Sequence, residues 1–272
     1  MTQIDEELHA RIHTAMMAVP PDAIFGRRVE VFPRVEKALG MQLHGRVLDV
    51  GCGNGYAGIW LARHRAVEEV VALEASPAAV DELIPRNVAH HGVGDRVRPR
   101  LGSFEAIGDV DAYDFVVAFG ALHHSPCLFS TLRSVAAALR AGGRLIAHEP
   151  VMPDLTSNAR YVAKYDVVED MHGLSIRNGD RDDHFFRHAE YVTAASFNAL
   201  DLVLDRPGEG LVPTLRRRLR RVLRRRPARS GRPRVADYTD GLESRLFVFE
   251  KQPVPYVPHL WRPLAEEGVA RS

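Results

Sequence analysis

One segment constrains the fold of this chain more than any other: an apolar strand that runs directly into alternating glycines and then into a helix. Its sequence is Val47-Leu-Asp-Val-Gly-Cys-Gly-Asn-Gly-Tyr-Ala-Gly58. Glycine lets the backbone turn tightly and approach a ligand without a Cβ in the way. The start of the following helix offers unpaired N–H groups. The segment therefore predicts a ligand-binding turn, with an ordinary glycine-rich connection as the alternative.

Short apolar runs alternate with amphipathic stretches along most of the chain. This alternation is typical of βαβ units in a parallel sheet that helices cover on both faces. After residue 150 the pattern breaks, and 151–187 is polar, irregular and without a clear strand. Strands are expected at 46–50, 69–73, 97–101, 115–119, 144–147, 199–205 and 244–250, and helices at 4–19, 24–39, 56–65, 77–91, 128–140 and 188–197.

Composition narrows the class of protein. The 272 residues are 46% hydrophobic, enough for one large domain with a sizeable core. No apolar run approaches the roughly 18 residues of a membrane helix, and the acidic start of the chain is unlike a secretory signal. Two cysteines, Cys52 and Cys127, make no disulfide framework. A cytoplasmic, reducing compartment is expected.

Two ligands compete for the glycine turn. The run Gly53 to Gly58 satisfies G-x-G-x-x-G, and Glu74 lies about 20 residues further on, as a dinucleotide site requires. Asp49 disfavours a dinucleotide, because a carboxylate just before the first glycine would repel the pyrophosphate of that ligand. The same charge favours a ligand that carries an ammonium and a sulfonium.

Four motifs in order over about residues 46–150 resemble the class I S-adenosylmethionine-dependent methyltransferases. They are Asp49-Val-Gly-Cys-Gly-Asn-Gly55, Glu74, Tyr113-Asp-Phe-Val-Val-Ala-Phe-Gly-Ala-Leu-His-His124 and Leu139-Arg-Ala-Gly-Gly-Arg-Leu145. The resemblance implies an α/β, Rossmann-like, seven-stranded and mostly parallel sheet. It implies an antiparallel last strand at 246–250, a helical N-terminal cap and a lid insertion, with S-adenosylmethionine as the cofactor.

The resemblance also implies which residues bind the cofactor. Glu74 matches the family's acid that holds both ribose hydroxyls. Many members carry an acid for the adenine amino group after the third strand, and Ser103 and Phe104 stand there instead. Phe119 and Gly120 should line the methionine end. The expected cofactor residues are Asp49, Gly51, Cys52, Gly53, Gly55, Glu74, Ala75, Ser103, Phe104, Phe119 and Gly120.

Histidines crowd the edge of the sheet where ligands bind in such folds. His123 and His124 follow the fourth strand, and His148 and Glu149 end the fifth. The carboxyl ends of parallel strands form the ligand edge. His124 or His148 is the expected general base. His123 is a third candidate, with anchoring of the loop as its alternative, and Glu149 either holds a backbone N–H or contacts substrate.

No metal is expected. His184 and His188 lie four residues apart beside carboxylates, which suits a metal, but a capped, solvated helix start is the preferred interpretation. Tyr161 and Tyr165 lie in the expected substrate lid. The predicted organisation is a helical cap at 1–45, a methyltransferase domain at 46–252 with a lid insertion at 151–187 and an arginine-rich insertion at 207–243, and an extended tail at 253–272.

An arginine-rich arm interrupts the last part of the domain. Residues 216–234 contain eleven arginines and no acid, although the whole chain has a net charge of only +1. An apolar stripe on its basic helix resembles a membrane-surface helix. Three readings follow: the arm covers the acidic body of its own chain or of a second copy in a homo-oligomer, it attracts an anionic or lipid-linked acceptor, or it binds nucleic acid. Peripheral membrane contact through residues 216–234 also stays open. Nucleic acid is disfavoured because no interleaved aromatics offer stacking platforms.

The sequence as a whole predicts an enzyme that methylates a small acceptor, a hydroxyl of a sugar or secondary metabolite. Methyl transfer is an in-line displacement, so positioning supplies most of the catalysis, and a hydroxyl acceptor also needs a base. Transfer to carbon or nitrogen of a quinone, lipid or other small molecule remains open. A nicotinamide-dependent oxidoreductase and a non-catalytic cofactor-binding module are the alternatives from other classes.

Overall fold

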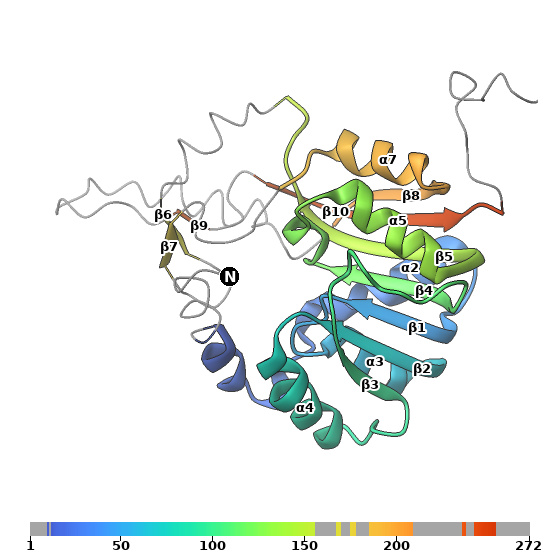
Figure 1. The fold of residues 1–272 in the computed structure, drawn as a ribbon. Helices are drawn as coiled ribbons and strands as arrows, with labels where there is room; N and C mark the ends of the chain where they lie inside the picture. Colours follow the sequence, from blue (N-terminus) through green and yellow to red (C-terminus); the bar gives the residue numbers. More distant parts are fainter. Residues whose placement is uncertain are drawn as a thin grey trace, which may run out of the picture.

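The computed structural model describes residues 10, 12–155, 167–169, 175–177, 185–208, 236–237 and 242–253. Seven strands form the main sheet: β1 (His44–Val50), β2 (Ala66–Glu74), β3 (Val97–Leu101), β4 (Tyr113–Phe119), β5 (Leu139–Val151), β8 (Leu200–Pro207) and β10 (Glu243–Lys251). Their order is β3-β2-β1-β4-β5-β10-β8 (Figure 1). The first five strands pair in parallel, and β10 is antiparallel to both its neighbours. The predicted Rossmann-like fold is confirmed.

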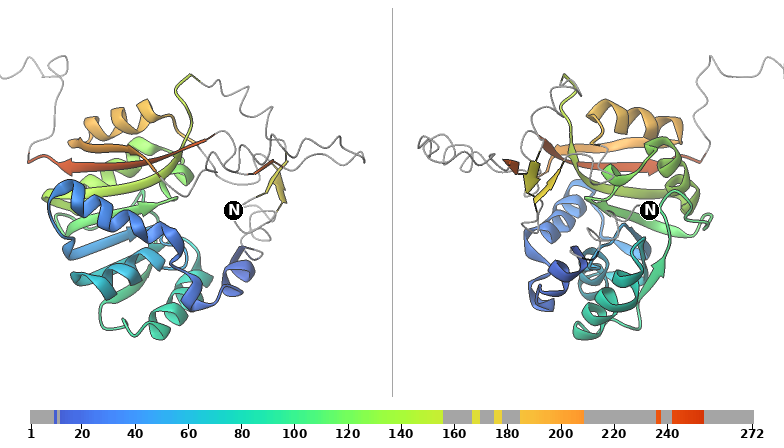
Figure 2. Two further views of the ribbon diagram at one scale, coloured as in Figure 1. Left: turned by 180° about the vertical axis from the view of Figure 1, so that it is seen from behind. Right: turned by 60° about the vertical axis from the view of Figure 1, so that its left-hand side comes forward.

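Helices cover both faces of this sheet. One face packs against α2 (Val31–Leu39), α3 (Tyr56–His64) and α4 (Ile84–His90), and the other against α5 (Leu128–Ala138) and α7 (His188–Phe197). Figure 2 shows α2 lying across the first face, seen from behind. Phe32 and Ile59 are fully buried on that side, and Leu132 and Tyr191 on the other. The strands are apolar on both sides because both sides are covered.

Helix and strand boundaries differ from prediction at several places. The expected helix at 128–140 ends at Ala138, because Leu139 adopts extended dihedrals and pairs with Tyr113. β5 is therefore 13 residues long, beyond the predicted 144–147. The expected helix at 24–39 begins as a 3-10 turn, η2 (Gly26–Glu30), and α2 ends at Gly40 with a left-handed φ of 66°. Glycine adopts that conformation without a steric penalty.

The insertion at 151–187, expected to lack strands, contains two of them. These are β6 (Val167–Glu169) and β7 (Ser175–Arg177), which pair antiparallel. On its other side β6 pairs in parallel with β9 (Ala236–Asp237). Because β9 belongs to the arginine-rich insertion at 207–243, the two insertions share one small sheet, which the sequence did not indicate.

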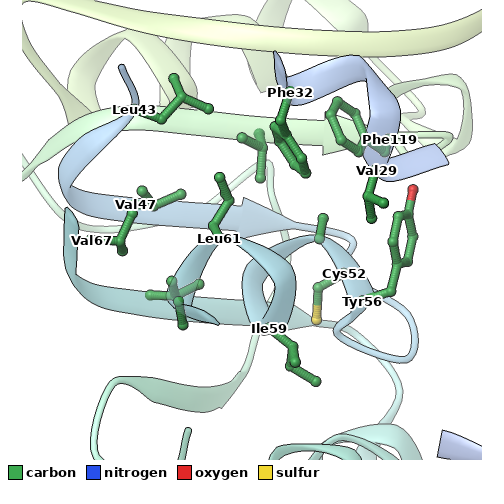
Figure 3. Close-up of a cluster of buried hydrophobic side chains, with 14 of the residues drawn as sticks. Val29, Phe32, Leu43, Val47, Cys52, Tyr56, Ile59, Leu61, Val67 and Phe119 are labelled. Carbon is green, nitrogen blue, oxygen red and sulfur yellow. The ribbon is translucent and has the colours of Figure 1, made fainter. Parts of the chain in front are cut away.

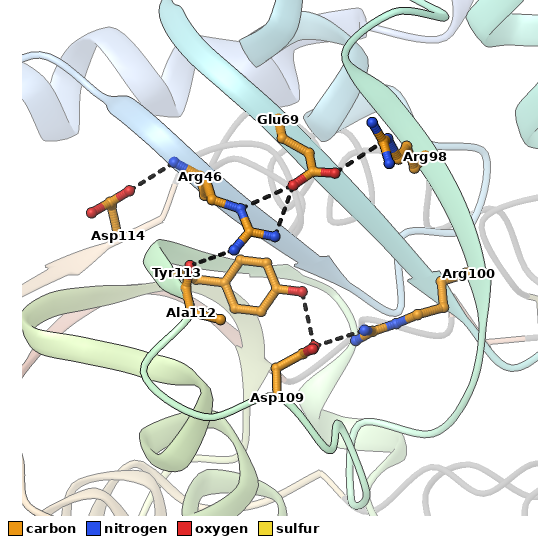
Figure 4. A network of polar contacts seen from close by, with 8 residues as sticks. All are labelled: Arg46, Glu69, Arg98, Arg100, Asp109, Ala112, Tyr113 and Asp114. Carbon is orange, nitrogen blue, oxygen red and sulfur yellow. Dashed lines mark hydrogen bonds and ion pairs between the residues drawn. The ribbon is translucent and has the colours of Figure 1, made fainter.

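A polar network ties the strands together where β1 and β4 begin (Figure 4). The Arg46 guanidinium donates to Glu69 Oε2 at 2.9 Å and to the carbonyl of Ala112 at 3.3 Å. Tyr113 and Arg100 both donate to Asp109 Oδ2, at 2.9 and 2.7 Å. Arg46 and Tyr113 lie near the amino ends of β1 and β4, so this part of the network lies away from the carboxyl edge that carries the glycine turn.

Candidate active site

The glycine turn after β1 needs glycine for two separate reasons. Gly51, Gly53 and Gly55 all have left-handed φ values, of 61°, 57° and 77°. A Cβ on Gly51 would also lie 2.7 Å from the Cβ of Ala121 in the loop after β4. The turn therefore brings two loops at the carboxyl edge of the sheet into direct contact.

Asp49 is buried beneath this turn and is held by the helix that follows it. Its Oδ2 accepts a hydrogen bond from the Gly58 backbone N–H at 2.9 Å. Burial raises the pKa of Asp49 to about 7, the Gly58 hydrogen bond lowers it, and the charge of Glu74 raises it. A carboxylate buried with one hydrogen bond is a favourable neighbour for a cation.

Glu74, at the end of β2, faces the same turn. Its Oε2 accepts from the Gly53 N–H at 2.8 Å, and its Oε1 accepts from the N–H groups of Ala75 and Ser76 at 2.9 and 3.1 Å. The carboxylate is therefore fixed beside the glycine turn, at the position where the sequence placed the ribose. Cys52 is buried in the turn, and its N–H donates to the Leu73 carbonyl at 3.2 Å.

The two residues expected near the adenine lie on the other side of the turn. Phe104 is half-buried, and its ring edge approaches Gly51 closely enough to lie 3.8 Å from a Cβ there. Ser103 is exposed, and its Oγ accepts from the Glu105 N–H at 3.2 Å. Phe104 thus flanks the turn, while Ser103 closes a local turn of its own.

Glu149 anchors the loop after β4. One carboxylate oxygen accepts from the N–H groups of Ala121 and Leu122 at 2.9 and 3.1 Å, and the other bonds His123 Nδ1 at 2.9 Å. Glu149 and His123 are both buried, and the His123 ring stacks on Phe185 at 5.3 Å. These contacts show that His123 and Glu149 anchor the loop after β4. Anchoring was one of the two roles that the sequence left open for each residue.

The two preferred base candidates differ in their surroundings. His124 is half-buried, with its ring 4.1 Å from that of His123. His148 is buried, and its Nε2 lies 2.8 Å from Ser244 Oγ. Its Nδ1 has no hydrogen-bond partner in the described part of the chain. Burial lowers the pKa of His148 to about 4, with Glu149 acting against this and Arg28 adding to it.

Aromatic rings connect His148 to the glycine turn. The Phe119 ring lies 6.0 Å from that of His148 in an edge-on arrangement and 6.4 Å from that of Tyr56, the first residue of α3. Gly120, next to Phe119, has a left-handed φ of 66°, and its N–H donates to the His148 carbonyl at 2.9 Å. β4 and β5 thus end together at the site.

Other predicted positions fall elsewhere. Tyr161, Tyr165 and His184 lie outside the described residues. His188 Nε2 is bonded to Asp205 Oδ2 at 2.7 Å, which ties α7 to β8.

One group of three potential metal ligands occurs in the described part of the chain: Asp22, His90 and His91. Both ring nitrogens of His91 are already engaged, by the Pro21 carbonyl at 3.0 Å and by the Arg63 guanidinium at 3.1 Å. This group therefore joins the N-terminal cap to α4.

Three residues near the site were not singled out from the sequence: Arg28, Tyr56 and Ser244. Tyr56 directly follows the last glycine of the turn, so its position at the start of a helix could be predicted from the sequence. Arg28 comes from the cap, and Ser244 from β10, 96 residues after His148. No local pattern links these two residues to the site, because only the packing of distant segments brings them there.

Comparison with known proteins relates this fold and turn to one class of protein, the α/β methyltransferases. The profile of a family described as "Methyltransferase domain" matches residues 48–145. A tRNA U34 carboxymethyltransferase of Saccharophagus degradans is 31% identical over 116 residues, which are 42% of this chain and 34% of that protein. The chain thus spans about a third of this curated relative.

Solved structures share the fold over a larger part of the chain. A Galdieria sulphuraria protein assigned as a sarcosine dimethylglycine methyltransferase superposes with a TM-score of 0.61 at 17% identity, covering 83% of this chain and 86% of the other. Geranyl diphosphate C-methyltransferase of Streptomyces coelicolor A3(2), solved with S-adenosyl-L-homocysteine, gives 0.57 at 16% identity, with coverages of 82% and 76%. At these identities the likeness establishes the fold.

The match over residues 48–145 and the shared fold support the predicted class I S-adenosylmethionine-dependent methyltransferase domain. They likewise support the predicted enzyme class and S-adenosylmethionine as the cofactor of the domain. No helix in the described part of the chain has the length and apolar character needed to cross a lipid bilayer.

Proposed function

We propose that this protein transfers the methyl group of S-adenosylmethionine to an oxygen of a small acceptor, a hydroxyl of a sugar or secondary metabolite, with His148 as the general base. The arrangement of His148 supports this more than any other observation. Its Nε2 can donate to Ser244 Oγ, which leaves the lone pair of Nδ1 for an acceptor proton. A base held in one tautomer by a second residue is a recurrent catalytic device.

The reaction balances with these groups. The acceptor oxygen attacks the methyl carbon in line, a C–O bond forms, and the C–S bond breaks with its electron pair going to sulfur. The acceptor proton passes to His148 Nδ1, and the products are a methyl ether and S-adenosylhomocysteine. A histidine of low pKa is unprotonated at neutral pH but a weak proton acceptor. His148 as a weak base suits an acceptor whose hydroxyl is acidic, or whose proton is lost only after the C–O bond has largely formed.

The cofactor half of the site is supported by Asp49 and Glu74. Both carboxylates flank the glycine turn, so the cation and the ribose hydroxyls of S-adenosylmethionine have complementary partners there. Phe119 and Gly120 end β4 between this turn and His148. The methyl group would then lie between the cofactor turn and the base, which is the order that in-line transfer requires.

Calorimetry is the first test of this function. S-adenosylhomocysteine should bind, and NAD should not, because Asp49 lies where a pyrophosphate would pass. Incubation with S-adenosylmethionine and a panel of hydroxyl acceptors, followed by mass spectrometry, then seeks products that are heavier by one methylene. Binding of NAD alone would establish the oxidoreductase alternative. Cofactor binding without turnover of any oxygen, carbon or nitrogen acceptor would support a binding module.

Transfer RNA is a second candidate acceptor, because the curated relatives matched by this chain are named tRNA U34 carboxymethyltransferases. The match covers about a third of those proteins, so it does not show that this chain acts on the same substrate. Incubation with bulk tRNA and S-adenosylmethionine carrying a labelled methyl group decides between the two: label in nuclease-sensitive material favours RNA, and label in small molecules favours the first proposal.

The arginine-rich arm, residues 216–234, lies outside the described residues, and its role is part of the proposal. An acceptor that is anionic or linked to lipid would be attracted by its eleven arginines. Deletion of the arm should then raise the KM for such an acceptor and remove its dependence on salt. Covering of the acidic body, in its own chain or a second copy, would instead leave KM and its salt dependence unchanged.

A further inference from the structure

β8 is an edge strand of the main sheet, and no other strand in the described part of the chain pairs with its outer side (Figure 1). The apolar cluster drawn in Figure 3 extends as far as Leu204, which packs against it partly buried. Leu202 and Val203 are 38% and 43% exposed. An exposed edge strand with apolar side chains is a template for pairing with another strand. The edge of β8 is therefore a surface on which a further strand can dock.

The hydrogen bonds to β10 determine which peptide groups of β8 face outward. The Gly208 N–H donates to the Ser244 carbonyl at 2.7 Å, and at the other end the Gln252 N–H donates to the Ala199 carbonyl at 2.9 Å. In an antiparallel pair, residues that bond to the neighbouring strand alternate with residues whose peptide groups point away from it. Val203 is skipped in the register with β10, so the alternation shifts there by one residue. Counted from the two ends, the outward peptide groups belong to Leu200, Leu202, Asp205 and Pro207.

Two exposed charges of β8 are complementary to each other. Neither Asp201 nor Arg206 forms an ion pair with another of the residues that the structure describes. Asp201 lies opposite Glu250 and Arg206 opposite Leu246, so both side chains lie on the same face of the sheet. Along one extended strand they are roughly 15 Å apart, too far for an ion pair. Only a second strand can bring such a pair of charges together.

We propose that β8 is a dimer interface, at which it pairs antiparallel with β8 of a second copy of this chain. A two-fold axis makes the contacts reciprocal, so Asp201 of each copy lies opposite Arg206 of the other. The same register places Leu202 opposite Asp205, whose outward peptide groups can then exchange hydrogen bonds. The charged residues stand at the positions between, where side chains of facing strands approach most closely. Charge and backbone hydrogen bonding thus select the same register independently.

Two features that usually protect an edge strand fit this register. Proline and bulges both limit pairing with unrelated strands. Pro207 lacks an N–H, but in this pairing its carbonyl accepts from the Leu200 N–H of the other copy. The bulge at Val203 lies beside the two-fold axis in both copies, so the two irregular stretches have equal length and face each other. The edge therefore discriminates in favour of its own copy, and the inference does not depend on the proposed function.

Sedimentation equilibrium of the full chain tests this interface. The wild-type protein should form a dimer of twice the 30.3 kDa of one chain at concentrations up to about 100 μM, a range that includes weak dimers. Asp201→Arg and Arg206→Asp each turn two attractive pairs into repulsive ones. Each variant should therefore raise the dissociation constant at least about 10-fold. Asp81→Arg is the matched control, because it reverses an exposed aspartate of η3 (Ala79–Leu83), outside β8, and should leave the constant unchanged.

A mixture of the two β8 variants tests the register itself. In a mixed dimer the two Arg side chains of Asp201→Arg lie opposite the two Asp side chains of Arg206→Asp, so both pairs are attractive again. The mixture should therefore form dimers although each variant alone is weakened. The double variant Asp201→Arg/Arg206→Asp restores both pairs within one chain and should also dimerise.

A monomeric wild-type protein overturns the inference. Slow hydrogen exchange of the Leu202 and Asp205 N–H groups in that monomer would assign the edge to another segment of the same chain. A dimer that neither β8 variant weakens, or that Asp81→Arg weakens equally, overturns the inference as well. So does a mixture that stays monomeric while the melting temperatures of both variants stay within a few degrees of the wild type.

Discussion

His148 Nε2 lies 2.8 Å from Ser244 Oγ across the antiparallel pair β5 and β10, although 96 residues separate the two. Gly208 closes over this contact, because a Cβ there would collide with both His148 Nε2 and Ser244 Oγ. In the proposed mechanism this hydrogen bond orients the ring and leaves Nδ1 for the acceptor proton. β10, which is antiparallel to both its neighbours, then supplies a residue to the proposed site.

Replacing His148 with Ala should lower kcat by roughly 10²- to 10⁴-fold, the usual contribution of a general base. S-adenosylhomocysteine affinity should change little, because the substitution leaves Asp49, Glu74 and the glycine turn unchanged. Since burial lowers the pKa of His148 to about 4, kcat at saturating S-adenosylmethionine should stay flat from about pH 5 to 8 and fall only as His148 is protonated near pH 4. Steady-state kinetics and calorimetry on His148→Ala, with His124→Ala in parallel, check this. Full activity in both variants would contradict the assignment of a histidine base.

Replacing Ser244 with Ala should reduce kcat by roughly 10- to 100-fold and leave KM nearly unchanged, because the ring of His148 would lose its orientation rather than its chemistry. The readout that separates positioning from simple destabilisation is the ¹⁵N spectrum of His148. The wild-type protein should show one tautomer with the proton on Nε2, and Ser244→Ala should show a mixture. A single unchanged tautomer in the variant would contradict the positioning role.

Asp49 should make stability depend on pH. Its pKa is raised from 3.8 to about 7 by burial, so the folded state binds a proton that the unfolded chain releases. The free energy of unfolding should therefore fall as pH rises from about 4 to 7, by up to about 4 kcal/mol. Asp49→Asn keeps an acceptor for Gly58 N–H and should remove this slope. Urea denaturation at several pH values measures it, and a slope that persists in the variant would assign it to other groups.

Gly58 should tolerate no side chain. A Cβ there would lie 2.7 Å from Val70 Cγ1 and 3.2 Å from Asp49 Oδ2. Overpacking of this kind costs about 1–3 kcal/mol, so Gly58→Ala should lower the melting temperature and weaken cofactor binding. Gly94→Ala is the matched control, because a Cβ there would lie 3.8 Å from Val88 Cγ1, an ordinary contact distance. Equal melting temperatures for the two variants would contradict the packing argument.

The succession of strands and helices over residues 46–150, the glycine turn and the acid that ends β2 were predicted from local periodicity and spacing. The antiparallel last strand was expected only from the family resemblance. Glu149 and His123 were placed at the correct edge, but their mutual hydrogen bond could not be foreseen, since it depends on side-chain direction at the ends of two strands. Ser244 and Arg28 were missed for a different reason. Each reaches the site from a distant segment whose own sequence contains no motif, so only tertiary packing identifies it.

The pairing of Val168 with Ala236 and of Glu169 with Asp237 joins segments that flank different strands of the main sheet. The strand edge of β6 is therefore completed by β9, which comes from the other insertion. A protein engineer who replaces one of the two insertions with that of a relative should therefore replace the other as well. A single exchanged insertion would lack the strand with which it pairs. Selection for a new acceptor would in the same way act on both insertions together, although they are separated in the sequence.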